Sequence, residues 1–215
     1  MAKGSLGGKR GRGTTADDMR SGKLNSQNLA GQTYFYDGNK TSTRATVDNW
    51  ESKRGDLGHE ELLMVDDDGF AIGYFKGDKT SVAFEVPRGV DTSKITLTHN
   101  HPTSGDARSI GGSFSDADIK NHLAFGFKET RATAKEGTYS FKTTSESNAK
   151  GFAKALDGRK TAVNKAYDDT VSSMKKKGYT LTDTEGIDLY LKISDAWYKA
   201  TASKYGYEYT FTKRR

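Results

Sequence analysis

The sequence contains no cysteine. This absence excludes a disulfide framework, zinc sites built from thiolates, a thiol nucleophile and the cysteine-containing zinc signature of the nucleobase deaminases. Any metal site in this chain must therefore use histidine and carboxylate ligands, and the chain holds only 4 histidines.

Long apolar runs are also missing. No stretch approaches the roughly 20 apolar residues that a membrane-spanning helix needs. The amino terminus is rich in Gly and Lys, where a signal peptide would need an apolar stretch. We therefore expect a soluble protein that is not secreted and has no membrane partner.

The chain has 215 residues, a net charge of +6, 11 Tyr and 10 Phe, which suits one folded domain with an extension. Part of the positive charge lies in residues 1–23, which are rich in Gly and hold little that could be buried. We expect this segment to be a flexible basic arm, acting either as a solubilising tail or as a contact to nucleic acid or protein. Residues 24–58 are polar with scattered aromatics and are expected to form an irregular cover over the core.

Residues 59–145 alternate between apolar runs and turns. The turn Asp66-Asp67-Asp68-Gly69 separates two apolar runs, at 62–65 and 70–75, and predicts a hairpin. Runs rich in β-branched residues at 81–86 and 94–98, and a later pair at 130–134 and 138–143, predict further strands. Ser115 and Asp118 have the spacing of a capping box, which predicts a helix from about Asp116.

In the remaining segment, 146–215, the apolar residues are spaced as in helices. Apolar residues at 152–174 and 185–203 recur every three or four positions, and a short alternating stretch at 207–211 predicts a closing strand. The expected fold class is therefore α/β, a mixed sheet flanked by helices, with the carboxy-terminal helices packed on the sheet and covering one side.

A group of polar residues at these predicted boundaries indicates metal chemistry. His99 and His101 are two apart on a predicted strand, so their imidazoles project from one face. Catalytic zinc typically takes three protein ligands, from histidine and carboxylate side chains, and leaves a fourth position for water. Asp118 is a plausible third ligand. Glu60 is the candidate general base that takes a proton from a metal-activated water. Ser115 could donate a hydrogen bond to an oxyanion, or simply cap the helix.

These residues, in the order Glu60, Thr98-His99-Asn100-His101-Pro102 and Phe114-Ser115-Asp116-Ala117-Asp118-Ile119, resemble the JAMM (JAB1/MPN) metalloprotease motif, most closely its RadC-like form. Segments around 129–141 are also similar to JAMM-like domains appended to phage head-morphogenesis proteins. The resemblance implies a JAMM or cytidine-deaminase-like fold and one Zn²⁺ per chain on His99, His101 and Asp118. It also implies hydrolysis of a peptide or isopeptide bond in a protein or peptide substrate.

The motif departs from the family in spacing and leaves two assignments open. Ser115 lies fourteen residues after His101, where the family has about eight, so we expect the loop that begins at Pro102 to hold an insertion of about six residues beside the cleft. Ser113 and Asp116 form a second Ser-x-x-Asp, although Phe114 and Ile119 flank the Ser115 register as in the family. Glu61 likewise competes with Glu60, and only one of them can approach the metal because neighbours on a strand face opposite sides.

The other two histidines have more ordinary interpretations. His59 would face away from Glu60 and receives no ligand role. His122 falls one turn beyond Asp118 and could reach the site, but a packing or solvent-facing role is favoured. Three hypotheses follow: an active zinc hydrolase, a RadC-like protein whose residues 1–23 contact nucleic acid, and a docking component that binds phage head or portal proteins. The protein would then act in the host cytoplasm or be associated with the virion.

Overall fold

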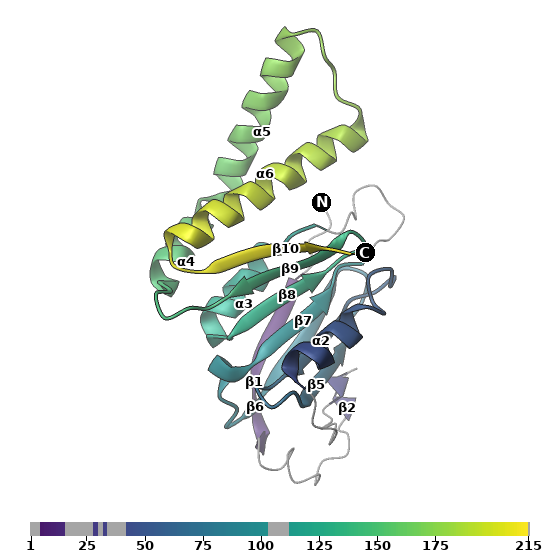
Figure 1. Cartoon of the computed structure of the whole chain (residues 1–215), viewed down its shortest axis with the longest axis vertical. Coiled ribbons are helices and arrows are strands. Elements are labelled where there is room, and N and C mark those ends of the chain that lie inside the picture. The colour runs from purple at the N-terminus through teal and green to yellow at the C-terminus, as the bar shows by residue number, and fades with distance from the viewer. Residues whose placement is uncertain (1–4, 16–27, 30–31, 34–41, 103–111, 215) are drawn as a thin grey trace.

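The structure is a computed structural model that describes residues 5–15, 28–29, 32–33, 42–102 and 112–214. One sheet runs through it (Figure 1), with the strand order β10-β9-β8-β7-β4-β5-β3-β2. Its strands are β2 (Asn28–Leu29), β3 (Gln32–Thr33), β4 (Glu61–Val65), β5 (Ala71–Lys76), β7 (Thr96–Asn100), β8 (Glu129–Thr133), β9 (Gly137–Lys142) and β10 (Glu208–Lys213). Among these described strands β7 and β8 are parallel and the other neighbours are antiparallel, so the sheet is mixed.

The connection between β7 and β8 determines where the candidate site lies. A parallel pair of strands needs a crossover, and helix α3 (Asp116–Phe125) supplies it. The carboxyl end of β7 and the amino end of α3 therefore meet beyond the ends of the strands. Open α/β sheets commonly hold ligands at this position. Ser115 begins the helix with the predicted capping box, in which its side chain accepts a hydrogen bond from the Asp118 N–H.

The two faces of the sheet are covered differently. Helix α2 (Thr43–Glu51) lies on one face, where Val47 and Trp50 pack against Leu63 and Val65 of β4. On the other face, the parallel pair β1 (Ser5–Thr15) and β6 (Ser81–Arg88) lies behind the sheet with α3 (Figure 1). The 3-10 helix η1 (Thr92–Lys94) leads from β6 into β7.

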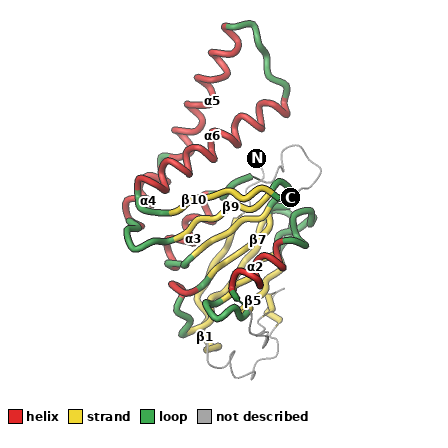
Figure 2. The backbone as a smooth tube through the Cα atoms, in the orientation of Figure 1, coloured by secondary structure: helices red, strands yellow, loops and turns green. Residues whose placement is uncertain are grey.

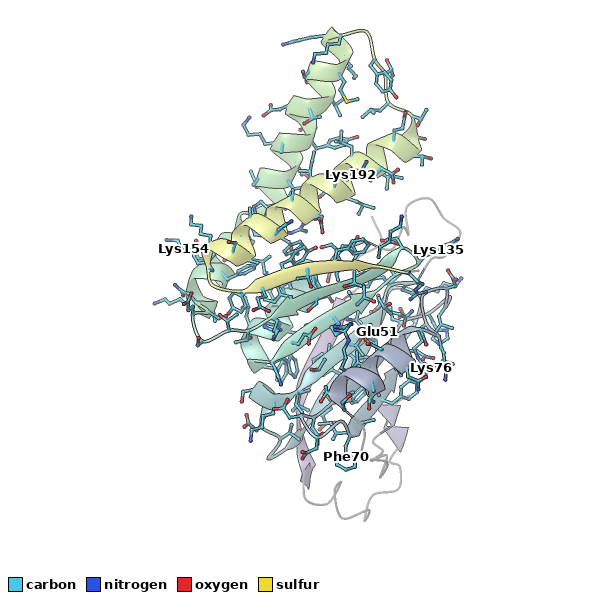
Figure 3. All side chains as sticks on the ribbon, in the orientation of Figure 1. Glu51, Phe70, Lys76, Lys135, Lys154 and Lys192 are labelled. Atoms are coloured by element: carbon cyan, nitrogen blue, oxygen red, sulfur yellow. The ribbon has the colours of Figure 1, made fainter. Side chains whose placement is uncertain are left out.

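A buried ion pair fixes α2 to the sheet. The Glu51 side chain points from α2 toward the strands (Figure 3), and it accepts hydrogen bonds from Arg131 Nε at 2.7 Å and Nη2 at 2.9 Å. Thr98 Oγ1 donates to the same carboxylate at 2.7 Å. Thr98 precedes His99 in β7, so this network holds the strand that carries both candidate histidines.

The carboxy-terminal segment consists of α4 (Ala149–Asp157), α5 (Arg159–Lys176), α6 (Asp183–Lys204) and β10. Strand β10 pairs with β9 at the edge of the sheet, and the nearby half of α6 buries Tyr198 and Ala202. The remainder of α6, together with α5, extends away from the sheet as a hairpin (Figures 1 and 2), and Val163 is the buried residue of α5. The helices were expected to cover one side of the sheet, but only the ends that lie nearest the sheet do so.

Most of the predicted elements are present, and the mixed α/β class is confirmed. The continuous helix expected over 152–174 is instead two helices, because the chain changes direction at Gly158, which ends α4 and begins α5. Residues 24–58, expected to be irregular, include helix α2, whose Ser42 cap accepts from the Ala45 N–H.

The amino-terminal segment also differs from its description as a flexible arm. Within residues 1–23, Ser5–Thr15 form β1, whose backbone pairs with β6. The parts of this segment at 1–4 and 16–23 lie outside the described residues, as do the aromatic residues at 34–36 and most of the proposed loop insertion, at 103–111. Within the described part of the chain, no helix combines the length and apolar character needed to cross a membrane.

Candidate metal centre

The carboxyl end of β7 and the first turn of α3 bring three side chains together: His99, His101 and Asp118. The two Nε2 atoms lie 3.0 Å apart, and Asp118 Oδ2 lies 3.5 Å from His99 Nε2 and 3.6 Å from His101 Nε2. His99 and Asp118 are each 1% exposed, and His101 is partly buried. The three side chains form a group that could hold a metal ion.

The spacing of these three atoms fits a small divalent cation. A tetrahedral ion with bonds of about 2.0–2.1 Å holds its ligand atoms roughly 3.3 Å apart. The observed separations of 3.0, 3.5 and 3.6 Å lie on both sides of that value. Two imidazoles and a carboxylate are also a donor set that suits zinc and related transition metals. The residues present therefore fit the metal that the sequence motif implied, although they do not identify which metal it is.

Backbone groups of the segment before α3 orient two of the three ligands. His101 Nδ1 lies 2.8 Å from the Gly112 carbonyl oxygen, so Nδ1 carries the hydrogen and Nε2 is left facing the cluster. The Ser115 N–H donates to Asp118 Oδ2 at 2.7 Å, and Ser115 Oγ accepts from the Asp118 N–H at 3.2 Å. The cap thus places the Asp118 carboxylate in the first turn of α3, where the helix dipole favours negative charge.

The electrostatics of the cluster favour a cation between the ligands. Burial would raise the pKa of the Asp118 carboxyl, but the charges and hydrogen bonds of His99 and His101 outweigh burial and hold this pKa below its usual range. Burial likewise opposes a charged His101, yet Asp118 and Glu60 outweigh it and raise the pKa of His101 to about 9. The two carboxylates therefore stabilise positive charge at this point in the protein.

Glu60 lies close enough to the cluster to interact with it electrostatically. Its side chain is 2% exposed, and its pKa is raised to about 8, first by burial and then by Asp118, while His101 acts in the opposite direction. Within the described residues, Glu60 Oε2 has no hydrogen-bond partner. A buried carboxyl with a pKa near neutrality can both accept and release a proton at physiological pH.

Glu61, the alternative to Glu60, is engaged on the opposite face. Its carboxylate accepts from Arg54 Nε at 2.7 Å and lies 2.8 Å from His59 Nε2. Asn100, between the two cluster histidines, also points to that face. Its Oδ1 accepts from the Glu61 N–H at 2.7 Å and its Nδ2 donates to the His59 carbonyl at 2.9 Å. Asn100 therefore holds both peptide groups that flank Glu60.

The alternative Ser-x-x-Asp register leads away from the cluster. Asp116 accepts a hydrogen bond from Arg159 Nε and another from the Tyr198 hydroxyl at 3.3 Å. Ser113 Oγ lies 2.8 Å from the Tyr209 hydroxyl. Asp116 and Ser113 thus contact the carboxy-terminal segment, whereas Asp118 lies with the histidines.

The remaining histidine candidate, His122, has a packing role. It is 1% exposed, and its two ring nitrogens each lie 2.9 Å from a threonine hydroxyl, Nδ1 from Thr130 and Nε2 from Thr143. Its ring meets Phe141 edge to face. Both nitrogens are engaged in these contacts, so His122 is not a metal ligand in this arrangement.

No protein-family model, curated protein or solved structure matches this chain. The fold and site therefore define only a class, a mixed α/β protein with a buried His-His-Asp group that could bind a metal ion. Sequence reasoning did not identify the parts played by Asn100, Gly112 and Tyr209. Gly112 acts through its backbone carbonyl, and Tyr209 acts through a contact between residues far apart in the sequence. The residue type at these two positions therefore does not predict either role.

Proposed function

We propose that this protein is a metal-dependent amide hydrolase of the JAMM type, acting on a peptide or isopeptide bond. The observation that carries the proposal is the convergence of two histidines and an aspartate, buried at a strand end, with a buried glutamate beside them. The two imidazole Nε2 atoms lie 3.0 Å apart with a carboxylate oxygen next to both, and this donor set suits a transition metal.

Each residue has a defined role in this proposal. His99, His101 and Asp118 would hold one Zn²⁺ per chain. When bound, the ion would supply Lewis-acid chemistry toward water and the substrate carbonyl. Glu60 would accept a proton from the attacking water and deliver it to the leaving amine, because its buried carboxyl lies beside the cluster and its Oε2 has no partner within the described residues. Ser115 caps α3 and so holds Asp118, and its hydroxyl hydrogen is not used in that cap.

Metal content is the first test. We expect about one zinc per chain in protein purified without chelator, with loss of the metal in His99→Ala and Asp118→Ala. His59→Ala is the matched control, because His59 lies on the other face and bonds Glu61, and it should retain the metal. Zinc-free wild type that zinc does not load, with an unchanged fold, would refute the proposal.

Hydrolysis is the second test. Glu60→Gln removes the proton acceptor and keeps nearly the same shape, so it should retain the metal and lose activity toward peptide and isopeptide substrates by about 10²-fold or more. Equal activity in Glu60→Gln and wild type would remove Glu60 from the mechanism, while leaving the metal site in place.

A second candidate function is docking to phage head or portal proteins. The hairpin of α5 and α6 supports it, because a projecting pair of helices offers a surface outside the domain (Figure 1). Co-assembly that Glu60→Gln leaves unchanged, without any hydrolysis by wild type, would favour docking. Contact of residues 1–23 with nucleic acid belongs to the RadC-like alternative and predicts binding that weakens steeply with salt.

A further inference from the structure

The short segment between the candidate ligands is held by the carboxy-terminal extension. Residues 112–118 provide the carbonyl that accepts from His101 and also carry Asp118. Three positions of this segment contact residues from beyond position 158. Ser113 contacts Tyr209, Phe114 packs against Tyr198 and Tyr209, and Asp116 pairs with Arg159.

Tyr209 contacts the residue that follows Gly112. Its hydroxyl donates to Asp195 Oδ1 at 2.5 Å and lies 2.8 Å from Ser113 Oγ. The ring is 9% exposed, stacks on Tyr198 with a centroid distance of 6.0 Å and meets Phe114 edge to face at 6.1 Å. The hydroxyl position is therefore set by ring packing on one side and by the Asp195 carboxylate on the other.

The path from Ser113 to His101 is one peptide group long. The carbonyl that accepts from His101 Nδ1 belongs to the peptide bond between Gly112 and Ser113. Because a peptide group is planar, fixing the Ser113 side chain and the buried Phe114 ring limits how far this carbonyl can rotate. Partners that hold the second nitrogen of a metal-binding histidine set its orientation, and removing them lowers metal affinity by about 10–100-fold.

We propose that Tyr209 and Asp195 are positioning residues for the metal centre, holding the Gly112–Ser113 peptide so that His101 presents Nε2 to the ion. The inference rests on the proposed function, since it assumes that the cluster binds metal. It assigns the extension a new role, because α6 and β10 then complete the site from the far end of the chain. Tyr209 acts through Ser113 and Gly112 and touches no ligand directly.

The test is zinc affinity, measured at one pH by competition with a chromophoric chelator, with thermal unfolding recorded for each variant. Tyr209→Phe removes the hydroxyl and keeps the ring, and we expect about tenfold weaker zinc binding. Ser113→Ala removes the other end of the contact and should cause a similar loss. The double variant should lose no more than either single variant, because both act through one contact.

Tyr207→Phe is the matched control. Tyr207 is a buried tyrosine two residues before Tyr209, and its ring stacks on Phe141 at 4.7 Å, in the core rather than at Ser113. It should bind zinc as wild type does. Unchanged affinity in Tyr209→Phe, or an equal loss in Tyr207→Phe, would overturn the inference while leaving the metal site intact. Wild type that binds no zinc would instead overturn the proposed function, and the inference with it.

Discussion

Replacing Asn100 by alanine should destabilise the protein by about 3 kcal/mol. The side chain is fully buried and bonds the Glu61 N–H at 2.7 Å and the His59 carbonyl at 2.9 Å. Leaving a buried N–H without its acceptor costs about 2 kcal/mol, and the partly buried carbonyl adds about 1 kcal/mol. These two groups flank Glu60, so the substitution also loosens the backbone that holds the candidate base.

Urea unfolding followed by tryptophan fluorescence measures this change. A chelator should be present, so that metal binding does not contribute to the measured stability. Asn164→Ala, at an exposed position in α5, is the control and should change the free energy of unfolding by no more than about 0.5 kcal/mol. A loss below about 1 kcal/mol for Asn100→Ala would refute the two-bond description of this side chain.

Three further outcomes are expected. Glu51→Ala should cost about 2–3 kcal/mol in urea unfolding, because the buried Arg131 loses its bidentate partner and keeps only its contacts with Glu129 and Asp48; a loss like that of an exposed pair, under 1 kcal/mol, would contradict this. Burial lowers the pKa of His122 to about 3 from an unfolded value of 6.5, so the unfolded state binds more protons between these pH values. His122 should therefore contribute a loss of about 1.4 kcal/mol per pH unit as pH falls through that window, so the pH slopes of wild type and His122→Gln should differ by about that amount; equal slopes would refute the assignment. Zinc at 100 times its dissociation constant should stabilise wild type by about 2.7 kcal/mol and leave His99→Ala unchanged, as thermal unfolding with and without zinc would show.

Local patterns predicted the elements around the candidate site well. The strand before His99 and the capping box at Ser115 depend on residues within a few positions of each other, and both are present. Alternation along β7 placed His99 and His101 on one face for the same reason. The break at Gly158 and helix α2 were missed, because the packing that selects them involves residues far away in the chain.

Long-range contacts decided the rest of the site. Both Ser-x-x-Asp registers were compatible with a helix start, and the pairing of Asp116 with Arg159 leaves Asp118 beside the histidines. Glu60 and Glu61 were likewise equivalent in sequence until Arg54 and His59 engaged Glu61 on the other face.

The sequence by itself therefore determined the kinds of ligand, their order and the local elements that carry them, because periodicity and capping act over one or two turns of chain. Only the tertiary structure decided which carboxylates face the histidines and that Tyr209 of β10 reaches Ser113 from nearly a hundred positions away. Such choices depend on the packing of distant segments, whose free energies are not encoded in any short pattern.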